Sequence, residues 1–174
     1  MKKFLSLSLV IAFLALGAEE LRAQGGFGGV HVGSEFTPNG NLLLIGGGGA
    51  WVINSNFYLG GAGYGSANTL GTNSGDLNSM GYGGFMFGYF KEVRESLRIG
   101  ADVLTGSGGY SVDDQEDEFF FIEPNVKAWY SIKPFMHLSV GAYYRIAYLN
   151  SDAILTDGDL SNFGIKLTLN FGVL

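Results

Sequence analysis

The residues of this chain that could do chemistry are charged side chains that stand singly among apolar ones. Within a segment they are separated by an even number of positions, as Glu123 is from Lys127 and Arg98 is from Asp102. On an extended backbone an even spacing places two side chains on the same face. A charge held away from bulk water must be paired or hydrated. We therefore predict an interior network of ion pairs, formed by Glu35, Arg98, Asp102, Glu123, Lys127, Arg145 and Lys166.

One pair in this network follows from a predicted hairpin that turns near residue 133. Across that hairpin Glu123 lies opposite residue 144 or 145, which predicts an ion pair between Glu123 and Arg145. Lys127 lies opposite a glycine, so we expect it to reach Glu35 or Asp102 across the interior.

A different chemistry would need a nucleophile and a base, and His137 and Ser139 have the spacing for it. Two residues apart on a strand they share a face, so the imidazole could take the proton of the hydroxyl. The pair has no supporting motif, and a His and a Ser at this spacing often occur by chance. We predict no catalytic residue and no bound cofactor.

Two acidic runs, at 113–118 and 157–159, carry the carboxylates that Ca²⁺ and Mg²⁺ prefer. Neither run follows the twelve-residue calcium loop, and a run of like charges is usually a solvated loop. We therefore predict no metal site. Residues 24–174 contain 7 basic and 14 acidic residues, and this acidic balance argues against binding of nucleic acid.

Long strands must position these residues. Residues 119–132 and 136–148 alternate apolar and polar side chains with a period of two, which predicts β-strand. Soluble strands are usually about 5–6 residues long, whereas a tilted strand needs about 9–11 to cross a bilayer. One face of each strand is unbroken apolar and the other carries charge, so the pattern predicts an apolar exterior around a polar interior.

The same alternation predicts eight antiparallel strands at 25–36, 42–53, 57–67, 80–90, 97–105, 119–132, 136–148 and 163–173. Long connections at 68–79, 106–118 and 150–162 alternate with short turns at 54–56, 91–96 and 133–134. Membrane barrels have short periplasmic turns and longer extracellular loops. The long connections hold nine acidic residues and no Lys or Arg, so we expect an acidic extracellular end and two periplasmic termini.

Pro124 interrupts this regular picture. Proline cannot donate a ladder hydrogen bond, and a closed barrel has no edge strand to accommodate it. We therefore predict a bulge or a locally broken ladder around residues 123–124.

Residues 1–23 have the pattern of a cleavable signal peptide. Lys2 and Lys3 precede an apolar run at 4–18 that is too short to span a membrane as a helix. We favour cleavage after Ala23, with cleavage after Ala18 as the alternative. The predicted domains are a signal peptide at 1–23 and one barrel at 24–174.

Together with the signal peptide and the alternating last strand, the aromatic and glycine run at 83–89 resembles the small eight-stranded outer-membrane barrels, the OmpA- and OmpX-like group. The resemblance covers residues 24–174. It implies an eight-stranded antiparallel up-and-down transmembrane β-barrel in the outer membrane. It also implies a monomer that contacts outer-membrane lipid and lipopolysaccharide and is inserted by the barrel-assembly machinery.

An eight-stranded barrel has an interior just wide enough to be filled by its own side chains. We therefore expect a non-enzymatic barrel with a closed lumen and a structural or surface-interaction role through its acidic loops. Three alternatives stay open: a narrow channel for ions or small solutes, a barrel-borne lipid hydrolase, and a soluble lipocalin-like binding barrel. The hydrolase alternative rests on the likeness of His137-Leu138-Ser139 to the His-x-Ser pair of outer-membrane lipid A deacylases.

Overall fold

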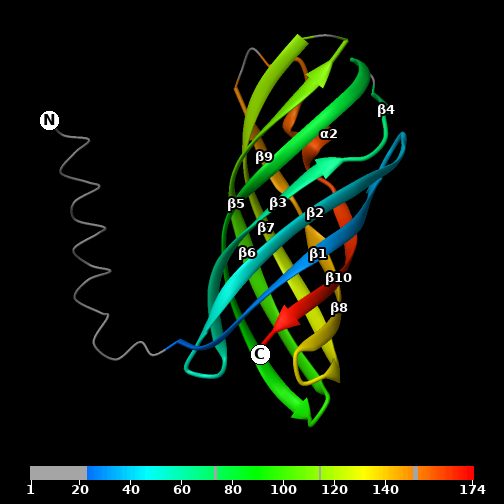
Figure 1. Ribbon diagram of the computed structural model, residues 1–174. Helices are drawn as coiled ribbons and strands as arrows, with labels where there is room; N and C mark the ends of the chain where they lie inside the picture. The colour runs from blue at the N-terminus through cyan, green and yellow to red at the C-terminus, as the bar shows by residue number, and fades with distance from the viewer. Residues whose placement is uncertain (1–22, 73, 114, 151–152) are drawn as a thin grey trace, which may run out of the picture.

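The computed structural model describes residues 23–72, 74–113, 115–150 and 153–174 (Figure 1). Apart from its last residue, the predicted signal peptide lies outside this part of the chain. In the described residues no helix is long and apolar enough to cross a membrane.

The described chain is almost entirely antiparallel β-structure, and its long strands follow from the alternation of apolar and polar residues. One short helix, α2 (Asp157–Leu160), lies between the last two segments of sheet. The strands are β1 (Ala23–Thr37), β2 (Gly40–Ile53), β3 (Phe57–Ser66), β4 (Leu70–Thr72), β5 (Gly75–Arg94), β6 (Leu97–Val112), β7 (Gln115–Lys133), β8 (Met136–Tyr144), β9 (Ile146–Leu149) and β10 (Phe163–Gly172).

The sheet closes on itself. Neighbouring strands follow the order β3-β2-β1-β10-β8-β7-β6-β5, and β5 pairs again with β3. Strand β9 continues the line of β8 against β7, and β4 forms a small hairpin with the start of β5. The prediction of an eight-stranded up-and-down barrel is therefore confirmed. Among the described residues, each strand of this closed order pairs with a neighbour on both sides, so the wall has no edge strand.

Two segments predicted as irregular loops are largely strand, so those boundaries were wrong. Strand β5 begins at Gly75, β6 continues to Val112, and β7 begins at Gln115. Most of 68–79 and 106–118 therefore belongs to the sheet. These extensions carry glycine and polar residues on their outer face, which hides the period of two. On the inner face Leu77, Tyr110 and Val112 are all buried and maintain it.

The seventh predicted strand is broken at Arg145, which lies between β8 and β9. Ladder pairs between β7 and this strand stop at Ile122–Ile146 and resume at Asn125–Tyr143 without a shift of register. The gap lies opposite Pro124, while pairing of β7 with β6 stays regular there. The prediction of a locally broken ladder at residues 123–124 is confirmed.

Alternate side chains face outward and inward as predicted. Val140 and Leu167 point away from the barrel with 50% and 51% of their surface exposed. The faces of β3, which the sequence left ambiguous, are now assigned, because Tyr58 and Tyr64 are buried while Phe57 and Leu59 are exposed.

The two ends of the barrel differ. Both described termini lie at the end that carries the tight turns at 54–56, 95–96 and 134–135 (Figure 1). At the opposite end, the hairpin of β6 and β7 rises above the other strands, and β4 and α2 lie near the mouth.

Candidate functional site

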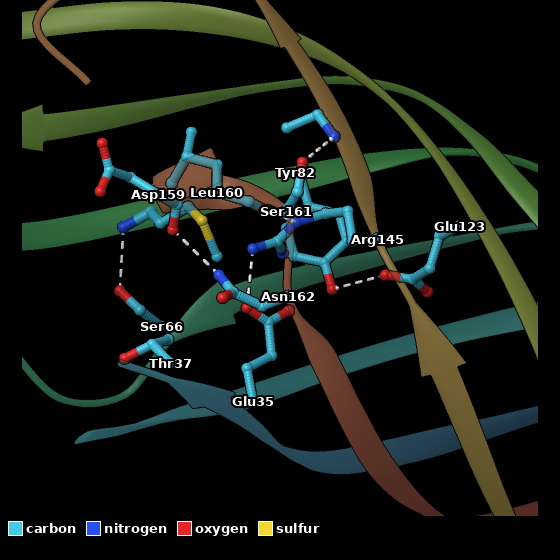
Figure 2. Close-up of polar contacts among 12 residues, drawn as sticks. Glu35, Thr37, Ser66, Tyr82, Glu123, Arg145, Asp159, Leu160, Ser161 and Asn162 are labelled. Atoms are coloured by element: carbon cyan, nitrogen blue, oxygen red, sulfur yellow. Dashed lines mark hydrogen bonds and ion pairs between the residues drawn. The ribbon is translucent and has the colours of Figure 1, made fainter. Parts of the chain in front are cut away.

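Three ion pairs lie inside the barrel, and both partners are buried in two of them (Figure 2 shows part of this region). Arg145 Nη2 lies 2.7 Å from Glu35 Oε2, and neither side chain has any exposed surface. Lys127 Nζ lies 2.6 Å from Asp102 Oδ2. The third pair joins Lys166 and Glu123. Six of the seven predicted interior charges are thus brought together in opposite-sign pairs, which offset the cost of removing each charge from water.

The predicted pair between Glu123 and Arg145 is wrong, although the register does place these two residues opposite each other. Arg145 is held instead by residues 153–162, the segment that contains α2 and is called the mouth segment below. Its backbone N donates to Asn162 O at 2.9 Å, and its Nε donates to Leu160 O at 2.9 Å. These contacts direct the rest of the guanidinium to Glu35, which leaves Glu123 to Lys166.

The contacts of Lys127 and Arg98 also differ from those predicted. Lys127 does pair with Asp102, as one of its two predicted partners, but on the adjacent strand β6 rather than across the interior. Arg98 pairs with Glu92 at 3.0 Å near the turn end, where the Glu92 side chain is 52% exposed. Arg98 therefore forms a separate pair at the rim.

Two tyrosines reach the buried carboxylates over a glycine. Tyr58 OH donates to Asp102 Oδ2 at 2.5 Å, and the strand between them contributes Gly88, which pairs with both residues in the ladder. Tyr143 OH donates to Glu35 Oε1 at 3.0 Å over Gly164 in the same way.

Any side chain at either glycine would collide with the tyrosine ring. The alternation of residues along the strands did not predict these tyrosines as partners of the acids. The signal would have been an inward-facing tyrosine, glycine and acid on three strands that are neighbours in the closed sheet.

Aromatic rings surround the charges. The Lys166 ammonium lies 3.9 Å from the ring centroids of both Tyr64 and Tyr143. The Arg145 guanidinium lies 4.7 Å from the ring of Tyr82, whose hydroxyl donates to Glu123 at 3.1 Å (Figure 2). Cation–π contact is strongest where water is excluded. The rings therefore add to the stabilisation that the ion pairs give Lys166 and Arg145 inside the barrel.

Aromatic clusters and a folded segment occupy the barrel on either side of the ion pairs. Tyr58, Phe90 and Trp129 pack together toward the turn end. Tyr82, Tyr110, Phe119 and Phe121 pack toward the other end.

At that second end, the segment that contains α2 covers the mouth, and its Leu155 and Leu160 are buried. Leu155 N donates to Tyr110 OH at 3.3 Å, and Ala147 N donates to Ser161 Oγ at 2.9 Å. Residues 153–162 of the third long connection therefore pack into the barrel mouth, and this part is not only a solvated loop.

The nucleophile–base pair considered from the sequence does not form. His137 Nδ1 lies 2.9 Å from Ser131 Oγ on the neighbouring strand, and Ser139 Oγ accepts instead from Asn170 Nδ2 at 3.2 Å. Both residues face the interior, as their parity predicted.

No protein-family model matches the sequence, and no curated protein matches it. Solved structures do share its fold. The N-terminal barrel domain of Pseudomonas aeruginosa OprF is similar with a TM-score of 0.58 and 9% identity, over 86% of this chain and 99% of that one. Neisserial surface protein A gives 0.57 and 11% identity, over 89% and 99%. The Escherichia coli outer membrane protease OmpT gives 0.50 and 8%, over 90% and 99%. The chain thus has the fold of the small outer-membrane β-barrels, as the resemblance predicted.

Proposed function

We propose that this protein is an integral outer-membrane barrel without enzymatic activity, whose closed interior supports an acidic surface for interaction outside the cell. Its termini lie in the periplasm. The main alternative is a narrow channel for ions or small solutes.

The observation that carries the membrane location is which face of the wall is exposed. Large apolar side chains such as Phe85, Phe120 and Val126 are 79%, 71% and 61% exposed. The charged residues at mid-height of the wall point inward and are buried, namely Glu35, Asp102, Glu123, Arg145 and Lys166. A soluble ligand-binding barrel requires the reverse arrangement, whereas a barrel in lipid requires this one.

Support for a closed lumen comes from its contents. Three ion pairs, the tyrosines bonded to them and two aromatic clusters occupy the interior, and the segment with α2 lies over one mouth. An eight-stranded barrel has little room beyond its own side chains. In the described residues this packing fills the space inside the wall with side chains, which supports a role without catalysis in the interior.

Support for a surface role comes from the length and charge of three strands. Strands β5, β6 and β7 contain 20, 16 and 19 residues, whereas about 9–11 residues cross a bilayer. The excess projects beyond the membrane at the end away from the termini, and its tip carries Asp113, Glu116, Asp117 and Glu118. One protein of this fold is itself named a surface protein.

The test combines localisation with conductance. We expect the full chain in the outer-membrane fraction and a heat-dependent shift on a gel, as for folded barrels. In planar bilayers we expect no steady current from the parent. A variant that combines Glu35→Ser with Arg145→Ser should open measurable conductance, because it removes the central pair and leaves polar space. Large steady currents from the parent would favour the channel, and recovery only in the soluble periplasm would overturn the membrane location.

A further inference from the structure

The outer wall of the barrel is not uniformly smooth. Two adjoining hollows of about 480 and 790 Å³ form one groove over β5, β6, β7, β8 and β10. Both hollows are lined by Tyr89, Ala101, Val126 and Ala142, which lie in one row of ladder partners around the barrel. The groove exists because alanines face outward between bulkier residues. Each hollow by itself has a volume in the range of small-molecule binding sites.

A lysine stands at one end of the groove. Lys91 was predicted to lie in a periplasmic turn, but it lies within β5, where it pairs with Ile99 and lines the larger hollow. Its side chain is exposed and shares the outward face with Tyr89 and Val93. In the part of the chain that the structure describes, Lys91 has no ion pair and no side-chain hydrogen bond. It lies three residues from the end of β5, beside the turn at 95–96.

We infer that this groove binds an anionic phospholipid, with an acyl chain along the alanine floor and the phosphate beside Lys91. The inference rests on the proposed membrane location and orientation, which put the lysine near the headgroups of the periplasmic leaflet. An apolar hollow in the hydrocarbon region is filled by hydrocarbon, because an empty one forfeits dispersion contacts. A lysine near the membrane surface extends its ammonium to the headgroups, where each basic residue contributes about 1 kcal/mol of attraction to anionic lipid.

The charge at the groove favours lipid over a second copy of this chain. A copy docked there would cover Lys91 without supplying an acid from its own groove. The one acidic residue among the lining residues, Asp102, has its carboxylate inside the barrel, where it is bonded to Lys127 and Tyr58. An unpaired charge buried at an interface is strongly unfavourable, whereas a phosphate provides the missing partner.

Native mass spectrometry of the folded full-length mature chain tests the inference. The protein in detergent is mixed with equal amounts of phosphatidylglycerol and phosphatidylcholine, and the retained lipids are counted. Lys91→Gln should lower the preference for phosphatidylglycerol about fivefold, the equivalent of about 1 kcal/mol, and Lys133→Gln is its control. Ala142→Phe or Ala101→Phe should reduce retention of both lipids, and Ile45→Phe on β2 is the control for added bulk.

The lipid site would be overturned if Lys91→Gln and Lys133→Gln lowered the preference for phosphatidylglycerol equally. It would also be overturned if the groove-filling variants and Ile45→Phe reduced lipid retention equally. Dimeric ions that disappear in Ala142→Phe would overturn it in favour of a second copy. A heat-shift gel on the same parent sample in vesicles separates the two proposals. A folded, inserted barrel without lipid preference refutes only the groove, whereas failure to insert refutes both.

Discussion

Arg145 and Glu35 form an ion pair although 110 residues and an intervening strand separate them. The pair is fully buried, and Tyr143 adds a hydrogen bond to the same carboxylate. The pair joins β1 to the break between β8 and β9, and Arg145 is also bonded to the mouth segment. It therefore connects regions of the barrel that hairpin contacts alone do not connect.

This arrangement predicts strong energetic coupling between the two residues. Glu35→Gln and Arg145→Met should each lower the free energy of unfolding by about 3–5 kcal/mol, because each leaves a buried charge without its partner. The double variant should lose clearly less than the sum, as measured by denaturant unfolding in detergent. Glu123→Gln combined with Arg145→Met serves as the control cycle, and a larger coupling there than for Glu35 and Arg145 would contradict the structure.

The two glycines beneath the tyrosines give a second prediction. Gly88→Ala and Gly164→Ala should each destabilise the barrel by about 1–3 kcal/mol, because the added methyl group meets the ring of Tyr58 or Tyr143. The control is Gly65→Ala on the outer face, where an added Cβ has ordinary contact at 3.9 Å with Met80 O. Its free energy of unfolding should change little. Equal losses at Gly65 and Gly164 would show that the tyrosine contact is not the cause.

The exposed apolar wall predicts a penalty that depends on depth. Val140→Arg and Leu167→Arg should each cost about 2–4 kcal/mol in lipid vesicles, because each places a charge near the bilayer midplane. Val93→Arg, at the turn end of β5, should cost about 0–1 kcal/mol because it lies near the interface. Unfolding in vesicles of defined composition measures both. A parent-like stability for Val140→Arg would mean that this face does not meet lipid.

The proposed orientation predicts which end of the barrel can be reached from outside the cell. The chain has no native cysteine, so Ser74→Cys and Ser55→Cys introduce single reactive thiols at opposite ends. On intact cells an impermeant thiol reagent should label position 74 and not position 55. Lysed cells, in which both positions should react, provide the control. Labelling of position 55 alone on intact cells would reverse the topology.

The wall of the barrel can be predicted from the order of the residues alone. A strand has a side-chain period of two, so alternation is enough to assign the facing of Val140, Leu167 and the inward charges. Pro124 likewise predicts the local break in the ladder, because a missing N–H is a property of the residue itself. Polar outer faces hide the ends of β5, β6 and β7, since a strand with no apolar contrast between its faces looks like a loop.

The pairing of the interior charges depends on the closed barrel. Hairpin register can relate only adjacent strands, and it correctly places Arg145 opposite Glu123. The actual partner of Arg145 depends on closure of the barrel, which brings β1 within reach, and on Leu160 and Asn162, which hold the arginine from the mouth segment. The groove beside Lys91 arises in the same way, because a hollow depends on the relative sizes of side chains on several strands that only the closed sheet brings together.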